Sequence, residues 1–360
     1  MTEQHAATRT LITREVVKPT PAELMEDTGT GLDFGTRPDR MPGHVTPADR
    51  FFVRNHAPTP RLDAATWTLR IEGDGVRAPV SYTYDDLWRR FPMVSVVATL
   101  ECAGNRRALF GEEAGARFEG TQWGRGAVGT AEWTGVRLRD LLEPAGVTSR
   151  ACEVMPEGLD AARACRPLPL AKALADDTLV TVAMNGEILP PDHGFPARIV
   201  VSGWLGAASI KWVGRIEVAE RPLRVPWNTR DYVLFGPGHP AEGTPITGVP
   251  VSALVELPWP ARLRPGPQIV RGRAFAGERP VVAVDYRVDE NEPWRPAVLT
   301  TPGSAGVWAR WQFHWNPRPD DHVIRVRAID DQGCSQPDSS AWNALGYCQN
   351  AVLAHPVMVG

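Results

Sequence analysis

The spacing of apolar residues changes along the chain. In the N-terminal part, stretches with the spacing of strands occur together with stretches that have the spacing of helices, which predicts an α+β domain. Residues 67–73 alternate apolar and polar side chains, which predicts a half-exposed strand ending at Gly73. Residues 93–100 form an apolar, β-branched run that predicts a buried strand. Residues 84–91 place aromatic and aliphatic side chains on one helical face, expected to lie in the core, and residues 138–142 predict a second helix.

Beyond residue 268 the pattern becomes one of strict alternation, which predicts a β-sandwich of immunoglobulin-like size. The arginines in this alternating region, Arg273 among them, are expected on outward, solvated faces. A proline- and glycine-rich stretch, residues 235–245, precedes the sandwich and is typical of a linker. The alternating stretches are residues 269–275, 281–288, 308–315 and 323–330. The predicted division is an irregular N-terminal arm (1–44), an α+β catalytic domain (45–243) and an immunoglobulin-like sandwich (244–360).

Composition narrows the class of protein. The 360 residues carry a net charge of −3 with acidic and basic residues interspersed, so no basic field predicts nucleic acid or an anionic membrane as a partner. Five widely spaced cysteines without a Cys-x-x-Cys pair argue against a disulfide framework, a zinc ribbon and covalent haem. No signal peptide or apolar run of bilayer-spanning length is evident, and we expect a soluble, cytoplasmic protein.

The first candidate for chemistry is Cys102, which directly follows the predicted buried strand. A lone cysteine in such a place is more often a small buried hydrophobic residue than a functional one. The neighbouring Arg106 and Arg107 change that balance, because guanidinium groups favour the thiolate, the form that attacks electrophiles or binds metals. They would equally favour a bound anion. Cys102 is therefore a candidate metal ligand or nucleophile.

A second candidate is the block of residues 183–215. Asn185 and Gly186 form a natural hairpin turn, and residues 199–201 predict a buried strand. The block supplies cations for a phosphate, an imidazole for ring heteroatoms and backbone amides freed by glycine, which suits a phosphate-bearing heterocyclic cofactor. A third candidate, residues 50–58, is a short apolar strand that runs into a loop bearing Arg, Asn and His.

The string LECAGNRR at residues 100–107 resembles the molybdenum-ligand segment of the sulfite oxidase family of molybdopterin enzymes, which includes eukaryotic-type nitrate reductases. The other candidate blocks resemble segments of the same family in the same order, over roughly residues 45–357. The resemblance implies a mixed α+β molybdopterin-binding domain of sulfite oxidase-like fold and a C-terminal dimerisation domain. It implies a Mo-molybdopterin cofactor, with no haem expected, and makes Cys102 the direct metal ligand.

The resemblance also implies roles for individual residues. Arg54 and Arg107 would neutralise the substrate anion, while Trp123 and Tyr232 would shape its pocket. The residues expected to hold the cofactor are Phe52, Val53, Arg54, Asn55, His56, Asp160, His193, Arg198, Ser209, Ile210 and Lys211. The chain departs from several family members near its C-terminus, where no arginine occurs in residues 343–347, so the anion pocket is expected to be less basic.

The expected activity is oxidation of sulfite to sulfate by oxygen-atom transfer at molybdenum, with electrons passed to an external acceptor and a homodimer formed through the C-terminal domain. Three alternatives remain open from the residues. The same fold could reduce nitrate or an organic S- or N-oxide. Cys102 could act without a cofactor as a nucleophile, with His56 or His193 as its base. The sandwich could be the working part of a binding protein without catalysis.

Overall fold

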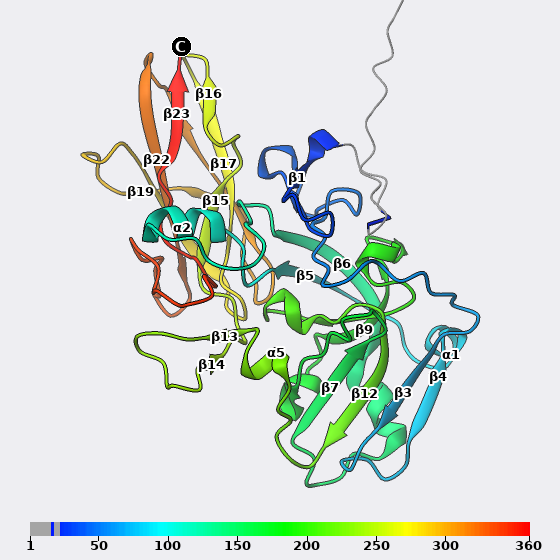
Figure 1. The fold of residues 1–360 in the computed structure, drawn as a ribbon. Coiled ribbons are helices and arrows are strands. Elements are labelled where there is room, and N and C mark those ends of the chain that lie inside the picture. The colour runs from blue at the N-terminus through cyan, green and yellow to red at the C-terminus, as the bar shows by residue number, and fades with distance from the viewer. Residues whose placement is uncertain (1–15, 18–21) are drawn as a thin grey trace, which may run out of the picture.

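The computed structural model describes residues 16–17 and 22–360. Figure 1 shows two strand-rich parts, a sandwich at the upper left and a mixed sheet-and-helix part at the lower right, with the first described strands between them. Those strands, β1 (Met25–Asp27) and β2 (Phe34–Thr36), form a small antiparallel hairpin inside the predicted arm. Most of the arm before residue 22 lies outside the described residues.

The mixed part contains two sheets that enclose one large hydrophobic core. The first sheet is antiparallel, whereas in the second β12 pairs with β3 in parallel and with β7 antiparallel. In order, the first consists of β10 (Glu187–Ile188), β9 (Thr178–Met184), β6 (Val128–Arg137) and β5 (Val94–Glu101), with β11 (Arg198–Val201) also on β9. The second consists of β4 (Val80–Thr83), β3 (Thr68–Glu72), β12 (Val213–Ala219), β7 (Glu153–Gly158) and β8 (Leu168–Pro169).

Helices in this part are short and lie at the sheet edges and in the connections. The first α-helix begins at a capping box in which Thr83 and Asp86 satisfy each other's backbone amides. The α-helices are α1 (Tyr84–Arg89), α2 (Arg107–Ala114), α3 (Leu138–Leu142), α4 (Leu170–Ala173) and α5 (Pro226–Thr229). The 3₁₀ turns are Ala22–Leu24, Pro38–Arg40, Glu143–Ala145, Pro191–His193 and Gly206–Ala208.

The C-terminal strands form two sheets whose inner faces share a second core that includes Trp311 and Phe313. A two-stranded hairpin of β13 (Val233–Leu234) and β14 (Thr244–Pro245) precedes them, so the predicted division after residue 243 falls inside a hairpin. One sheet is β15 (Ser252–Val255), β17 (Gln268–Phe275), β21 (Ala309–Trp315) and β20 (Val298–Thr301). The other is β16 (Ala261–Leu263), β23 (His355–Val359), β22 (Asp320–Asp330), β18 (Val281–Val288) and β19 (Arg295–Pro296).

Three local predictions were wrong, each for a tertiary reason. Trp88 is 40% exposed rather than in the core, because its six-residue helix buries Leu87 and leaves the next position at the rim. Residues 50–53 form no strand, and only Val53 makes an isolated bridge, to Phe34. Arg273 is 1% exposed, because its guanidinium forms an ion pair with Glu256, donates to the Gly43 carbonyl of the arm at 2.7 Å and stacks on the Trp308 ring.

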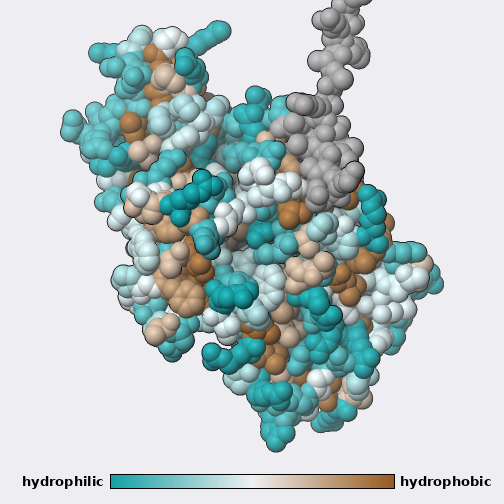
Figure 2. Space-filling view, in the orientation of Figure 1, coloured by the Kyte–Doolittle hydropathy of each residue, from teal (hydrophilic) through white to brown (hydrophobic). Residues whose placement is uncertain are grey.

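The two parts meet around the loop that follows β5. Arg106 is fully buried and donates from Nη2 to Ser252 Oγ of the sandwich at 3.2 Å. The amide of Cys348 donates to the Ala103 carbonyl at 2.8 Å. The sandwich therefore braces the loop that carries Cys102. In the face shown in Figure 2, polar residues cover most of both parts and leave only scattered apolar areas. Among the described helices, none is long and apolar enough to cross a membrane.

Candidate active site

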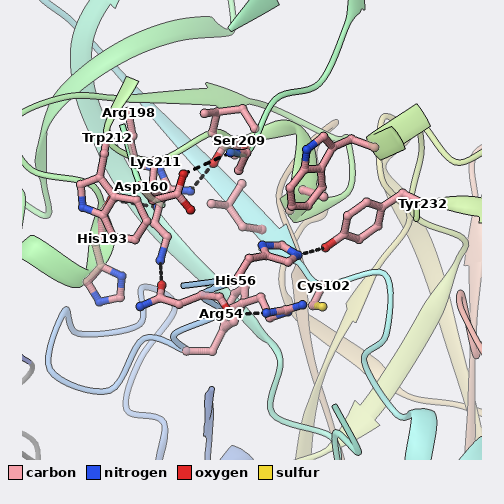
Figure 3. A pocket seen from close by; sticks show the side chains of 18 of the residues that line it. Arg54, His56, Cys102, Asp160, His193, Arg198, Ser209, Lys211, Trp212 and Tyr232 are labelled. Atoms are coloured by element: carbon pink, nitrogen blue, oxygen red, sulfur yellow. Dashed lines mark hydrogen bonds between the residues drawn. The ribbon is translucent and has the colours of Figure 1, made fainter. Parts of the chain in front are cut away.

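One cavity in the mixed part gathers most of the residues that the sequence singled out (Figure 3). Its walls come from the loop before β3, the end of β5, the turn after β7, the segment around β11 and the segment around α5. The predicted residues that line it are Phe52, Arg54, Asn55, His56, Cys102, Asp160, His193, Arg198, Ser209, Ile210, Lys211 and Tyr232. Side chains separated by up to 180 positions thus converge on one space.

Cys102 lies at one end of this cavity, one residue beyond β5, as the strand prediction required. The loop that carries it is fixed by Asn105, which donates to Glu101 Oε1 at 2.8 Å and accepts from the Ala127 amide at 3.0 Å. The amide of Cys102 itself donates to the Ala127 carbonyl at 2.9 Å. The thiol is therefore held at the cavity wall by a rigid turn rather than by a mobile loop.

The protonation of Cys102 differs from what its neighbouring arginines alone predict. Burial raises the pKa of the thiol, and this effect outweighs the lowering by Arg54, the Gly104 amide and Arg107. The arginines act in the predicted direction but do not produce a thiolate by themselves. A bound cation would supply the missing stabilisation, because a metal ion binds the thiolate and releases its proton.

Two cations, Arg198 and Lys211, lie at the other end of the cavity in the view of Figure 3. Arg198 donates to the carbonyls of His193 at 3.0 Å and Ser209 at 2.9 Å, and its guanidinium lies 4.8 Å from the Trp133 ring centroid. Lys211 donates to Asn55 Oδ1 and to the Asp192 carbonyl. Among the residues that the structure describes, the side chains of Arg198 and Lys211 donate to carbonyl and amide oxygens and to no carboxylate.

Burying these two positive charges without a carboxylate hydrogen-bonded to them costs free energy, and a bound anion would remove that cost. Burial lowers the pKa of Lys211 to about 7, with a further lowering by Arg198, and burial lowers the pKa of Arg198 to about 9. A phosphate between them would supply the compensating charge and accept their free donors. Gly194, whose φ is +112°, lets the chain that carries both cations pack closely, since a Cβ there would lie 2.8 Å from Arg198 Cβ.

The donor set fits a metal carried by a phosphate-bearing cofactor. One thiol is available for the metal at one end, and two buried cations are available for a phosphate at the other. Between them, Asp160, His193 and the Asn55 amide offer polar contacts to a heterocycle. Across residues 16–17 and 22–360, no cluster of three His, Cys, Asp or Glu side chains is arranged to hold a metal.

His56 and Tyr232 form a pair beside Cys102. The His56 Nε2 and the Tyr232 hydroxyl are 2.8 Å apart, and the imidazole packs edge-on against Trp227 at 4.5 Å. Burial, Arg54 and Lys211 hold the pKa of His56 well below its usual value, so this ring is neutral near pH 7. Its hydrogen bond goes to a phenol rather than to the thiol, which gives no support to His56 as the base of a cysteine nucleophile.

Arg54 is positioned by a carboxylate that the sequence did not single out. Its Nη1 lies 3.3 Å from Asp33 Oδ1 and also donates to the Asn55 carbonyl. The same carboxylate accepts the Asn55 amide at 3.0 Å and the Thr121 hydroxyl at 2.6 Å. Asp33 thus fixes the loop that presents Arg54 to the cavity. Only its spatial neighbours reveal this role, because it lies in the proline- and glycine-rich arm.

Three predicted residues do not line the cavity. Val53 packs in a separate apolar cluster, so its side chain points away from the cavity. Trp123 is fully buried behind Phe52, with ring centroids 6.4 Å apart. Arg107 donates from Nε to the Leu345 carbonyl at 3.0 Å and from Nη1 to the Thr121 carbonyl at 2.9 Å. Their predicted roles toward cofactor and substrate stay predictions.

Several lining residues were missed. Trp227 stands at the start of the short motif that contains Tyr232, so its proximity was a usable signal. Trp212 adopts a φ of +54° and packs its ring 4.4 Å from Lys211 Nζ, which no pattern in the sequence indicates. The other missed lining residues are Phe51, Leu100, Ala164, Gly206 and Ala207.

Comparison with known proteins shows the family to which this chain belongs. Residues 56–227 match the model of the oxidoreductase molybdopterin binding domain. The chain is 38% identical over 334 residues to the sulfite oxidase of Gallus gallus, covering 85% of this chain and 72% of that protein. The chain belongs to the sulfite oxidase family. It is also 31% identical over 346 residues to a nitrate reductase [NAD(P)H] of Hordeum vulgare, covering 86% of this chain and 38% of that protein.

Other relatives are longer than this chain or are known as structures. The mitochondrial sulfite oxidase of Mus musculus is 35% identical over 335 residues. The match covers 86% of this chain but only 60% of that relative's length. The crystal structure of the sulfane dehydrogenase SoxCD from Paracoccus pantotrophus superposes with a TM-score of 0.80 at 28% identity. That match covers 89% of this chain and 82% of the other. Family membership makes this cavity the candidate molybdopterin-binding site.

The buried lysine gives the cofactor-free protein a distinctive pH dependence. The usual lysine pKa of 10.5 is lowered to about 7 in the folded state, so between these values the unfolded chain binds more protons than the folded one. The contribution of Lys211 therefore makes the free energy of unfolding rise with pH over this interval. We expect sulfate, which keeps its charge throughout, to raise the melting temperature more at about pH 6 than at about pH 9. Lys211→Met should reduce this difference and leave the part that comes from Arg198, whose pKa is about 9.

Proposed function

We propose that this protein is a molybdenum-cofactor oxidoreductase that oxidises sulfite to sulfate and passes the electrons to an external acceptor. The observation that carries the proposal is one cavity with a single rigidly held thiol, Cys102, at one end and the unpaired cations Arg198 and Lys211 at the other. Its relatives include proteins named sulfite oxidase and sulfane dehydrogenase, which favours a sulfur substrate over nitrate.

Each residue then has a defined task. Cys102 binds the metal as a thiolate, and Arg198, Lys211 and Ser209 hold the phosphate end of the pterin. The cofactor supplies oxygen-atom transfer and two-electron redox chemistry. Arg54 binds the oxygens of the anionic substrate, with its orientation fixed by Asp33. Neutral His56 orients the Tyr232 hydroxyl, which can donate a hydrogen bond to a substrate oxygen once the substrate is bound.

The test uses the intact protein purified from cells that make the cofactor. We expect sulfite to drive reduction of ferricyanide, and nitrate to accept no electrons from a reduced dye on the same preparation. Protein from molybdate-starved cells should lack the sulfite-dependent activity. Full activity after molybdate starvation would instead support the cofactor-free cysteine nucleophile, and nitrate reduction without sulfite oxidation would support the alternative substrate.

Further parts of the proposal concern assembly and organisation. We propose that the C-terminal sandwich is immunoglobulin-like and mediates a homodimer, and that the chain acts in the cytoplasm without a membrane or nucleic-acid partner. The two-sheet arrangement of the sandwich supports the first part. The five cysteines, which form no disulfide with one another, are compatible with a reducing compartment. Sedimentation of the intact protein measures the dimer directly.

A further inference from the structure

Three aromatic rings and a guanidinium form a row beside the cavity. Trp227 stacks on Tyr232 with centroids 5.9 Å apart and an interplanar angle of 12°. Tyr232 stacks on Tyr347 at 5.7 Å and 20°, and the Arg107 guanidinium lies 4.8 Å from the Tyr347 centroid. Trp227 and Tyr232 line the cavity, whereas Tyr347 and Arg107 do not. The cavity thus has an aromatic wall on this side.

Arg107 is locked behind this wall. Two of its donors are used by backbone carbonyls, those of Leu345 and Thr121. A Cβ at Gly104 would lie 2.8 Å from its guanidinium, and a Cβ at Gly120 would lie 2.9 Å from it, so the group fills a slot between two glycines. The Tyr347 ring packs against its face and also against Tyr232. The side chain of Arg107 therefore lies behind the cavity wall, and its charge acts on the cavity only from there, where it offsets part of the rise that burial causes in the pKa of Cys102 and of Tyr232.

The end of the cavity near Cys102 is consequently lined by a single guanidinium, that of Arg54. Arg54 lines it, but its guanidinium is already in an ion pair with Asp33 at 3.3 Å. Lys211 and Arg198 belong to the opposite end, where the cofactor phosphate is proposed to bind. A fully ionised sulfite carries two negative charges, and burying a charge that is only partly compensated is costly. A substrate with one negative charge suits a single guanidinium better.

We infer that this site accepts organic sulfinates, R–SO₂⁻, in addition to sulfite, and that Tyr347 sets this preference. The inference rests on the proposed function. The two oxygens of a sulfinate match the two donors of the Arg54 guanidinium, and the substituent R packs against the wall made by Trp227 and Tyr232. The sulfur retains the lone pair on which the new S–O bond forms, as it does in sulfite.

The reaction balances as R–SO₂⁻ + H₂O → R–SO₃⁻ + 2 H⁺ + 2 e⁻. The sulfur is oxidised by two electrons, and one S–O bond forms with an oxygen that derives from water. Both protons leave to solvent. The two electrons reduce two molecules of a one-electron acceptor, which in the assay is ferricyanide.

Benzenesulfinate and sulfite are the two probes for the molybdenum-loaded protein. We expect both to be oxidised, with kcat/KM values within about tenfold of each other. Binding of the two products gives a readout that does not depend on turnover. Calorimetric titration should show benzenesulfonate binding at least about tenfold more tightly than sulfate, since the aromatic wall adds contacts that sulfate lacks.

Variants at Tyr347 separate its ring from its hydroxyl, which donates to the Asp231 carbonyl at 2.5 Å. Tyr347→Leu removes the ring that packs against Arg107, and it should shift both the kcat/KM ratio and the product-affinity ratio toward sulfite and sulfate by about tenfold. Tyr347→Phe keeps the ring and should change either ratio by less than about threefold. Equal effects of the two variants would overturn the role of the ring.

The outcomes distinguish this inference from the proposed function. Oxidation of sulfite without oxidation of benzenesulfinate, or benzenesulfonate binding no better than sulfate, would refute the sulfinate inference and leave the proposed function standing. Failure of the molybdenum-loaded protein to oxidise either probe would refute both.

Discussion

Replacing Cys102 by serine is expected to lower sulfite-driven ferricyanide reduction by at least about a thousandfold, the largest effect of any single substitution. Cys102 is the one thiol among the residues that line the cavity, and a hydroxyl is a harder, less acidic ligand that does not replace a thiolate. The pterin should remain bound, because Lys211 and Arg198 hold it at the other end. Steady-state kinetics with a pterin assay on the same sample measures both effects.

Cys334→Ser is the control for this substitution. Cys334 is exposed in the turn after β22 and far from the cavity lining, so this variant should keep wild-type activity. Comparable activity in Cys102→Ser and wild type would refute the assignment of Cys102 as the metal ligand. Thermal unfolding of each variant checks that the fold is retained.

Replacing Lys211 by methionine is expected to reduce the amount of cofactor that co-purifies by at least about tenfold. A hydrogen bond to a charged group contributes about 1.5–3 kcal/mol, which corresponds to a ten- to hundredfold change in affinity. Methionine has a similar length but neither charge nor donor, so the contact with the phosphate is lost, and a thioether takes the place of the ammonium over the Trp212 ring. Molybdenum by elemental analysis and pterin by fluorescence measure the loss.

Lys172→Met is the matched control, since Lys172 pairs with Glu278 at 2.8 Å and lies outside the cavity lining. Because Lys172 does not reach the cavity, the cofactor content of this variant should equal that of wild type. If Lys211→Met retained a full complement of cofactor, the phosphate would have to bind elsewhere.

Much of the fold was predictable because its strands carry local signals. Residues 67–73 alternate, and β3 spans Thr68–Glu72 with alternating burial that ends at Gly73. The apolar run before Cys102 became β5, and Asn185 and Gly186 form the expected turn, both with positive φ. The period-two stretches became the long strands of the sandwich. In each case one face of the element is buried, so the pattern of side chains records the structure.

The errors arise where contacts between distant segments override local pattern. Arg273 sits at an alternating position that predicts solvent, yet Gly43 of the arm and the Trp308 ring cover its guanidinium. Trp88 has helical spacing, but the helix is too short and too close to the edge to bury it. Asp33, which fixes Arg54, and Tyr347, which packs on Tyr232, are 21 and 115 positions from their partners. No local pattern encodes such pairings.

The candidate site also divides into a part that the sequence predicts and a part that it does not. The residues that line the cavity were found as a set because their motifs occur together and in order, which makes coincidence improbable. The orientation of each side chain was not predictable, as Arg107 illustrates. It follows Cys102 by five positions, and no motif indicates that its donors bind carbonyls behind the aromatic wall. Its expected role toward the substrate stays a prediction. Its slot between Gly104 and Gly120 is a product of tertiary packing.

X-ray absorption spectroscopy at the molybdenum edge tests the central claim most directly, because it counts the sulfur atoms bound to the metal. The wild-type protein should show the sulfurs of the pterin together with one more from Cys102, and Cys102→Ser should show one sulfur fewer at unchanged pterin content. An identical sulfur count in the two proteins, or a wild-type protein that binds no molybdenum, would contradict the account.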